Sequence, residues 1–230
     1  FQPYGKEGQF INSVSRSGLN LVLIEQADRN EHVELFFNQK CLDINLEASK
    51  LTFEDYTTGK VQEVQSEFVF GTDGAFSAVR SAMQRTDRFN YEQSYIPHGY
   101  KELSIPATSS GEFQLDKNAL HIWPRKSFML IALPNKDGSF TCTLFLSFEG
   151  ETAFEHLQTK AQIDSFFAEQ FPDVVPLIPD LAQQFIDNPT GSLVTVKCSP
   201  WQRNNTIILG DASHAIVPFY GQGMNAGFED

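Results

Sequence analysis

The sequence lacks the features that mark several large classes of protein. Its longest apolar runs, such as residues 128–133 and 144–146, fall far short of the roughly 20 residues that a transmembrane helix requires. Lys and Arg are scarce, with 17 of them against 29 Asp and Glu, and the formal net charge is −12. Because contacts with phosphate groups need clustered basic side chains, this balance argues against a nucleic-acid-binding protein and against one that binds an anionic membrane surface.

Cysteine is scarce as well. Cys41, Cys142 and Cys198 lie far apart and in unrelated contexts, so they offer neither the spacing of a metal site nor a disulfide framework. Their odd number fits a protein of a reducing compartment.

The two ends of the chain carry no signal of a start or a finish. The sequence begins FQPYG, without an initiator Met or a signal-peptide pattern, and it stops at residues 228–230 inside an expected helix. We therefore interpret it as an internal part of a longer protein and expect part of its functional site to be missing.

What is present is an ordinary globular composition with one excess. Apolar residues make up 41% of the 230 residues, which excludes a disordered chain and suits one large domain or two modest ones. Phe is the exception, with 21 copies.

The first third of the chain has alternating helix and strand patterns. Ser15 precedes a helical pattern that ends near residue 30, and strand-like runs follow at 33–37 and 41–46. Residues 51–56 and 61–64 flank a Thr-Thr-Gly-Lys turn and are predicted to form a hairpin. A short strand at 67–71 leads to a helix over 75–85, which Ser77 or Asp73 is placed to cap.

The middle of the chain is rich in aromatic and branched residues. Four strands are predicted there, with a hairpin turn at 135–139, and they indicate an antiparallel sheet: 100–105, 120–123, 128–133 and 140–148. Helical patterns follow at 160–170 and 180–187, and strands return at 192–198 and 206–209. The whole pattern predicts a mixture of α/β and α+β architecture.

Segment 206–215 is the most informative candidate site. A buried strand ends at Gly210 and Asp211, where the glycine allows close approach and the carboxylate is able to accept hydrogen bonds from sugar-like hydroxyls. Shortly afterwards Gly221 and Gly223 open a helix, whose backbone N–H groups favour an electron-rich ligand atom. The alternative is a glycine-rich turn in which Asp211 is an ordinary helix cap.

Segment 70–80 has a similar arrangement, in which an Asp-Gly pair follows a strand and precedes a helix. Arg80, Arg85 and Arg88 lie close together in an otherwise acidic chain and are able to hold a phosphate group. The alternatives are a common Asp-Gly turn and a solvated basic helix face.

These segments resemble the motifs of the single-component (class A) FAD-dependent aromatic hydroxylases. GTDGAFSAVR (residues 71–80) is similar to their Asp-Gly motif, and LGDASH (209–214) is similar to their Gly-Asp motif. Three further strings resemble the branch of this family that hydroxylates kynurenine: YIPHGY (95–100), LHIWPR (120–125) and VPFYGQGMN (217–225). The resemblance runs along nearly the whole chain, although the family's N-terminal Gly-x-Gly-x-x-Gly segment and its C-terminal region are absent.

The resemblance implies a fold with two interleaved parts. A Rossmann-like FAD-binding domain of the GR2 type, without its N-terminal dinucleotide-binding segment, would include residues 1–90 and 190–230. An antiparallel-sheet substrate domain would include residues 91–189. Together, the two parts agree with the α/β plus α+β class that the sequence pattern predicts.

The resemblance also implies two cofactors, FAD and the co-substrate NADPH. In the family the Gly-Asp aspartate binds the ribityl chain of FAD, the glycine-rich turn lies against the flavin ring, and the Asp-Gly motif serves both FAD and NADPH. The implied cofactor-binding residues are Arg16, Asp73, Gly74, Arg80, Gly210, Asp211, Gly221, Gln222, Gly223, Met224 and Asn225.

The implied substrate is an aromatic amino acid, L-kynurenine, with O₂ as the other reactant. Tyr4 matches a family tyrosine that binds the substrate carboxylate, and the matching arginine would precede Phe1. Alternation places Ile131 and Leu133 on one face of a strand, as a pocket wall requires, although core packing is the simpler role for each apolar residue. The apolar residues assigned to the ring are Leu120, Ile131, Leu133, Phe145, Pro218 and Phe219.

No side chain is assigned a catalytic role, because the resemblance implies that a flavin hydroperoxide transfers the OH group. His214, His98 and His121 are interpreted as structural hydrogen-bonding residues, with proton transfer by His214 as an alternative. Two other functions stay open, a related hydroxylase of a hydroxybenzoate or salicylate and a non-catalytic fragment that does not retain FAD. No metal or nucleic acid is expected.

The resemblance also bears on cellular location. Eukaryotic relatives are held at the cytosolic face of the mitochondrial outer membrane by a C-terminal segment, and a cytoplasmic location is expected otherwise.

Overall fold

The computed structural model describes residues 2–3 and 5–230, without the side chain of Tyr220, and divides them into two compact units. One unit consists of the residues up to Glu34 together with Pro97–Ser192. The other consists of Leu35–Ile96 and Leu193–Asp230, so the chain passes between the units three times. No helix in the described part of the chain has the length and apolar character needed to cross a bilayer.

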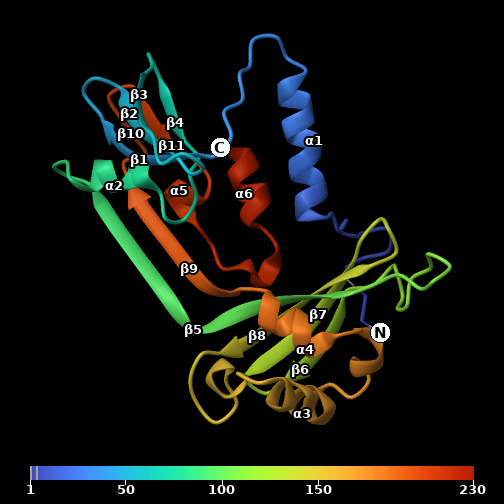
Figure 1. Ribbon diagram of the computed structural model, residues 1–230. Coiled ribbons are helices and arrows are strands. Elements are labelled where there is room, and N and C mark those ends of the chain that lie inside the picture. The colour runs from blue at the N-terminus through green and yellow to red at the C-terminus, as the bar shows by residue number, and fades with distance from the viewer. Residues whose placement is uncertain (1, 4) are drawn as a thin grey trace. The chain divides into compact units, whose positions relative to one another are not determined.

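The first unit is built on a five-stranded sheet with the order β6-β7-β8-β5-β9 (Figure 1). The pairs β6–β7, β7–β8 and β8–β5 are antiparallel, as the aromatic-rich strand patterns predict. β6 lies at one edge of the sheet and contains Pro124. The strands are β5 (Asn90–Ile105), β6 (His121–Arg125), β7 (Phe128–Pro134), β8 (Phe140–Ser147) and β9 (Thr190–Ser199).

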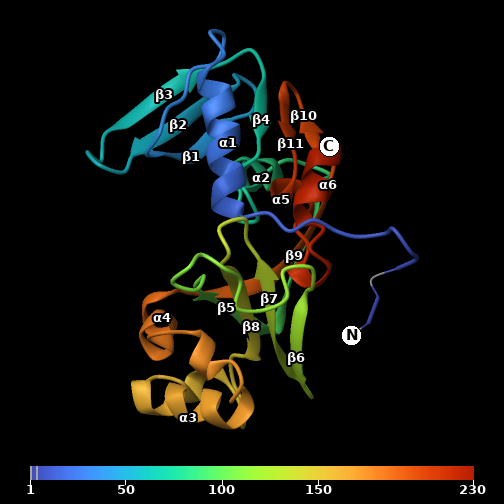
Figure 2. The same cartoon turned by 90° about the vertical axis from the view of Figure 1, so that its right-hand side faces the viewer.

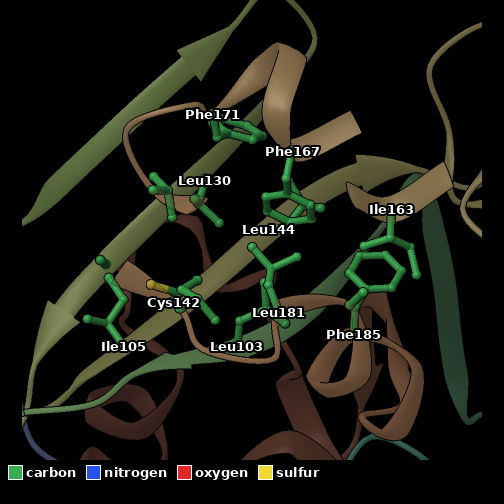
Figure 3. Close-up of a cluster of buried hydrophobic side chains, with 14 of the residues drawn as sticks. Leu103, Ile105, Leu130, Cys142, Leu144, Ile163, Phe167, Phe171, Leu181 and Phe185 are labelled. Atoms are coloured by element: carbon green, nitrogen blue, oxygen red, sulfur yellow. The ribbon is translucent and has the colours of Figure 1, made fainter. Parts of the chain in front are cut away.

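One face of this sheet forms the main hydrophobic core. α3 (Lys160–Gln170) and α4 (Leu181–Asp187) cover it, together with the short 3₁₀ helices η1 (Phe154–His156) and η2 (Val175–Leu177) (Figures 1 and 2). Side chains from the strands and from both helices meet there, and Leu130, Leu144 and Phe167 are completely buried (Figure 3). Burial of this many large apolar side chains is the principal source of stability for the unit.

Local signals in the sequence set the ends of the helices in this unit. α1 (Arg16–Asp28) begins after Ser15, whose hydroxyl accepts a hydrogen bond from the Gly18 N–H. α3 begins with a capping box in which Thr159 and Gln162 bond to each other's backbone N–H groups. No residue of α1 is buried, although Leu21 and Val22 are apolar.

The second unit has two three-stranded sheets. The order β1-β2-β3 is an antiparallel meander of β1 (Gln39–Asn45), β2 (Lys50–Asp55) and β3 (Val61–Gln65). The order β10-β11-β4 joins β10 (Gln202–Arg203) to β11 (Thr206–Ile208), and β11 runs parallel to β4 (Val69–Gly71). The helices of this unit are α2 (Ala78–Gln84), α5 (Asp211–His214), the 3₁₀ helix η3 (Pro218–Tyr220) and α6 (Gly223–Glu229).

The structure differs from the sequence expectations in several elements. β5 begins at Asn90, ten residues before the predicted start, and the short strand β10 was not predicted. Residues 33–37 do not form a strand, and Val33, Phe36 and Phe37 are exposed. A run of β-prone residues becomes a strand only where a neighbour pairs with its backbone, which is a tertiary condition. The division into compact units places the residues up to Glu34 with the sheet of the first unit, whereas the predicted domain bounds place them with residues 35–90. Which unit binds FAD and which binds substrate stays a prediction.

Candidate functional site

The Gly-Asp segment lies at the carboxyl end of β11, beside the Asp-Gly segment. β11 and β4 run parallel, and the Leu209 N–H donates to the Gly71 carbonyl at 3.0 Å, so both strands end at the same edge. Ligands of open α/β sheets bind at the carboxyl ends of parallel strands. The structure therefore brings the two sequence motifs together at the type of edge where a ligand is expected.

Gly210 makes the turn between β11 and α5 in a backbone conformation that other residues rarely adopt. Its φ is +57° and its ψ is −140°, which lies in a region favoured by glycine. Asp211 then opens α5 with an exposed carboxylate that forms no hydrogen bond or ion pair with any described residue. The carboxylate is free to accept hydrogen bonds from a ligand.

The Asp-Gly segment uses its polar groups differently. The Asp73 carboxylate accepts hydrogen bonds from the Ala78 and Val79 N–H groups, at 2.7 and 3.2 Å, and the Ser77 hydroxyl accepts one from the Arg80 N–H at 2.8 Å. Both candidate caps are therefore used at the start of α2. Gly71 is required for close packing, because a Cβ there would lie 2.9 Å from the Val79 side chain.

Arg80 is buried between the two motifs. Its side chain is 2% exposed and donates to the Ala75 carbonyl at 2.6 Å and to the Ala212 carbonyl at 2.8 Å. The guanidinium also lies 5.1 Å from the centre of the Tyr91 ring, while its Nε has no partner among the described residues. The expected solvent-facing basic patch is therefore wrong in including Arg80, because this side chain joins two backbone segments of the interior.

The other two arginines of the expected patch are exposed. Arg85 pairs with Asp43 at 2.5 Å, and the hydrogen bond from Arg85 is the main reason why the pKa of Asp43 is lowered. Arg88 lies in the left-handed region with a φ of +59°. The basic character of this segment at the surface therefore comes from these two residues.

The glycine-rich turn leads into α6, and the end of α6 packs against the Gly-Asp segment. Gly221 ends η3 with a φ of +62°, Gln222 precedes α6, and an added Cβ at Gly221 would meet no atom within 4 Å. Behind the turn, an added Cβ at Gly227 would lie 3.6 Å from the Gly210 Cα, so the two backbones are in close contact. The space at the Cβ position of Gly221 is therefore open, apart from its two neighbours in the chain.

The remaining residues predicted in this turn are near its surface. Gly223 is the first residue of α6, and Met224 and Asn225 follow it with exposed side chains. The Asn225 amide donates to the Gln222 side chain at 2.9 Å. The free N–H groups of the first helical turn and the exposed side chains fit the polar edge of a planar cofactor.

Asp230 is a residue of this site that the sequence analysis missed. Its carboxylate accepts a hydrogen bond from the Gly210 N–H at 2.5 Å, and His214 Nε2 lies 2.8 and 2.9 Å from its two oxygens. The Gly210 hydrogen bond, followed by that from His214, lowers the pKa of Asp230. The ring of Trp201 packs 5.0 Å from that of His214. These contacts support the structural interpretation of His214, and no local pattern indicated a partner 16 residues away.

The other two histidines also bond to the backbone. His98 Nε2 lies 2.9 Å from the Ser127 carbonyl, and His121 Nε2 lies 2.9 Å from the Asp116 carbonyl. No group of His, Cys, Asp or Glu within the described part of the chain has the arrangement of a metal site.

Four of the predicted substrate residues share one face of the sheet in the first unit. Met129 and Ile131 on β7 pair with Phe145 and Thr143 on β8, and directly opposed residues project to the same side. Leu133 is on that side because it is two residues from Ile131, and Leu120 precedes β6 next to it. The opposite side carries the buried Leu130 and Ala132 and packs against the helices.

The remaining predicted residues are distributed over both units. Pro218 and Phe219 form η3 in the second unit, where both are exposed, and Gly74 has a φ of +81° in the Asp-Gly turn. Arg16 is the exposed first residue of α1 in the first unit. Tyr4 lies outside the described residues.

Comparison with known proteins identifies the family of the chain. A model of the FAD binding domain family matches residues 5–230. The chain is similar to a kynurenine 3-monooxygenase of Flavobacterium psychrophilum, with 53% identity over the whole chain and 52% of that protein. It is also similar to a kynurenine 3-monooxygenase of Dictyostelium discoideum, with 50% identity over the whole chain and 50% of that protein. The chain thus spans about half the length of the curated relatives it matches.

A solved structure shares the fold at low sequence identity. The tetrameric form of 2-methyl-3-hydroxypyridine-5-carboxylic acid oxygenase has a TM-score of 0.71 and 20% identity, and the match covers 92% of this chain and 54% of that one. The family match covers nearly the whole chain and includes both cofactor motifs at the ends of β4 and β11. The chain belongs to the FAD-binding domain family.

Proposed function

We propose that the full-length protein is a flavin-dependent monooxygenase that hydroxylates L-kynurenine at the 3-position of its ring with NADPH and O₂. The observation that carries this proposal is the identity of 47–53% over the whole chain with six relatives named kynurenine 3-monooxygenase. The free carboxylate of Asp211 and the open turn at Gly221 support the part of the proposal that concerns cofactor binding.

FAD is proposed to bind at the edge of the β10-β11-β4 sheet. Asp211 would accept hydrogen bonds from the ribityl hydroxyls, and the backbone of Gly210 would allow the chain to approach. The turn from Gly221 to Asn225 would lie along the flavin, where N–H groups at the start of α6 favour negative charge. Bound FAD would supply the redox chemistry that activates O₂, which the protein's side chains do not provide.

The Asp-Gly segment has a different part in this proposal. Asp73 and Arg80 hold the loop around Gly74 through contacts with backbone groups, so they would act on FAD and NADPH by fixing the shape of that loop. The side chains of Arg85 and Arg88 are the exposed cations of the same segment. In a chain with a net charge of −12, they are the residues proposed to attract the anionic coenzyme.

The apolar face of the first unit is proposed to hold the substrate ring. Leu120, Ile131, Leu133 and Phe145 share that face and lie outside the main core, and Phe145 is buried there. An apolar wall positions an aromatic ring and excludes water from the reacting atoms. Pro218, Phe219 and Tyr4 are proposed as further substrate residues on the strength of the resemblance, and Arg16 as a cofactor residue.

The test uses purified full-length protein and a choice of substrates. We expect a bound flavin with visible absorbance, NADPH oxidation that rises on addition of L-kynurenine, and 3-hydroxykynurenine as the product by mass spectrometry. Stimulation by 4-hydroxybenzoate or salicylate alone would favour the related hydroxylase instead. A colourless protein that does not acquire FAD would favour a non-catalytic role.

The cellular location is proposed by resemblance alone. In a eukaryote the protein would lie at the cytosolic face of the mitochondrial outer membrane, held by a segment beyond Asp230, and otherwise in the cytoplasm. Fractionation of cells that express the full-length protein tests this proposal.

A further inference from the structure

The sheet of the first unit has a second face that is divided by polarity. We call it the open face, and define it by the side chains of β5–β8 and of residue 120 that point away from the main core. Its residues are His98, Tyr100, Glu102 and Ser104; Leu120, Ile122 and Pro124; Met129, Ile131 and Leu133; and Thr141, Thr143, Phe145 and Ser147.

The half of the open face on β6 and β7 is entirely apolar. Leu120 and Ile122 are 43% and 52% exposed, and Ile131 and Leu133 are half-buried. The half on β8 and β5 is mostly polar, with the hydroxyls of threonine, serine and tyrosine and a single carboxylate. A ligand that lay across the four strands would meet apolar groups at one end and polar groups at the other.

Glu102 supplies that carboxylate, and its place is set by the register of the strands. Ile122 is opposite Ile131, Ile131 is opposite Thr143, and Thr143 is opposite Glu102. Neighbouring strands are about 4.7–4.9 Å apart, so Glu102 stands about 10 Å from Ile131, with only Thr143 between them. The four side chains form one row across the sheet.

The carboxylate of Glu102 is not used by the protein itself. The Glu102 side chain is exposed and forms no hydrogen bond or ion pair with any residue that the structure describes. Its backbone carbonyl, in contrast, accepts a hydrogen bond from the Asn188 amide at 2.8 Å, so the strand is fixed at this point. Beside it, the Tyr100 ring lies against Gly191, where any Cβ would overlap the ring.

We propose that Glu102 binds the α-ammonium group of an amino-acid substrate whose aromatic ring lies on the apolar half of the open face. This inference rests on the proposed function and adds to it the residue that selects for an amino acid. An ammonium group is the best partner for a carboxylate, because a hydrogen bond with charge on both partners is stronger than a neutral one. Thr143 lies between the two ends and offers a hydroxyl to the middle of the ligand.

The same row explains how the ring is oriented. If the ammonium group is held at β5, the ring is drawn along the row toward Ile131 and cannot slide along the strands without losing the ionic contact. Orientation of this kind contributes to rate because the reacting atoms are already placed. Glu102 thereby acts on specificity through binding, and takes no part in the chemical step.

The experiment compares Glu102→Gln with Glu92→Gln in the full-length enzyme. Glu92 is an exposed residue of the same strand in the other unit, and its side chain forms no hydrogen bond or ion pair with a described residue, so the second variant is a matched control. Each protein is assayed with L-kynurenine and with its analogue that lacks the α-amine, 4-(2-aminophenyl)-4-oxobutanoate. FAD content and the melting temperature are measured for all three proteins.

We expect the KM for L-kynurenine to rise about 10- to 100-fold in Glu102→Gln, with kcat within about 3-fold of the wild type, as for loss of one hydrogen bond between charged groups. The KM for the analogue should be the same in Glu102→Gln and the wild type, and Glu92→Gln should match the wild type throughout. Equal KM changes for both substrates, or no change for either, would overturn the inference. A wild type that does not hydroxylate kynurenine would overturn the proposed function as well, whereas an active wild type with an unchanged Glu102→Gln overturns this inference alone.

Discussion

The two aspartate motifs of the second unit are alike in sequence and opposite in structure. Each follows a short strand of the same sheet and precedes a helix. Asp73 uses its carboxylate on the N–H groups of Ala78 and Val79, and Arg80 of the same segment is buried. Asp211 leaves its carboxylate exposed and without a partner among the described residues.

This difference separates residues that maintain a site from residues that contact a ligand. A polar group whose hydrogen bonds are satisfied within the chain contributes to stability, whereas a free polar group at a strand end is available for a ligand. By this criterion we expect Asp73 and Arg80 to support the site, and Asp211 is the residue proposed to contact the cofactor. Substitutions in the two motifs should therefore have different consequences, and three experiments test this. A fourth concerns Asp230, which bonds to Gly210.

The largest effect is expected for Arg80→Ala. Removal of the guanidinium leaves the carbonyls of Ala75 and Ala212 without their donor in the interior, so the free energy of unfolding should fall by about 3–5 kcal/mol. Chemical denaturation of the full-length protein measures this. Arg85→Ala is the control, because loss of its exposed pair with Asp43 should cost only about 0–1 kcal/mol. Similar small losses in both variants would mean that Arg80 does not join the motifs.

The next effect is expected for Asp211→Asn. The affinity for FAD should fall about 10- to 100-fold, as for loss of charged hydrogen bonds, while the stability of the apoprotein changes by less than about 1 kcal/mol. Titration of the apoprotein with FAD, followed by flavin fluorescence, gives the affinity. A destabilised apoprotein with normal FAD affinity would contradict the comparison, since Asp211 would then be a structural residue like Asp73.

A smaller effect on stability is expected for Asp73→Ala. The two hydrogen bonds to the start of α2 are lost, and removal of a helix cap costs about 1 kcal/mol. The melting temperature of the apoprotein should therefore fall by a few degrees, in contrast to Asp211→Asn. Ser77→Ala removes the other cap of α2 and should resemble it. A change confined to the affinity for FAD would place Asp73 with Asp211 instead.

The smallest effect concerns pH. The folded protein lowers the pKa of Asp230 through the Gly210 N–H and His214. Its contribution to stability is therefore present above the ordinary aspartate pKa of about 4, and is lost as the pH falls through the lowered value. The melting temperature of Asp230→Asn should be below that of the wild type at pH 6, and the two should converge below pH 4. Parallel curves would show that the Asp230 carboxylate is not held in this way.

The sequence was sufficient for elements whose signals are local. Ser15 and Thr159 begin helices where their patterns place them, and the turn at residues 135–139 joins two antiparallel strands through the Asn135 and Ser139 backbones. The failure at residues 33–37 has a physical reason, because a strand requires a partner that the local sequence does not specify.

The sequence predicted which residues belong to the candidate site better than it predicted the contacts between them. The residues around Gly210 and Gly221 were identified from glycine spacing and resemblance, and the structure places Gly227, in the helix that follows Gly221, against Gly210. The burial of Arg80 was not predictable, because a charged residue near two others is usually a surface residue. The contact of Asp230 with Gly210 depends on how α6 folds back, which no short pattern encodes. Interior hydrogen bonds between distant segments are thus the part that required a structure.

Pro124, at the edge of the five-stranded sheet, has a consequence for the behaviour of the protein in concentrated solution. An edge strand offers unpaired backbone groups that are able to recruit a strand from another molecule, and an apolar open face next to it increases that hazard. Proline has no N–H to donate and is tolerated mainly at sheet edges. It therefore removes one backbone donor from this edge strand, which limits strand pairing between molecules beside the apolar half of the open face.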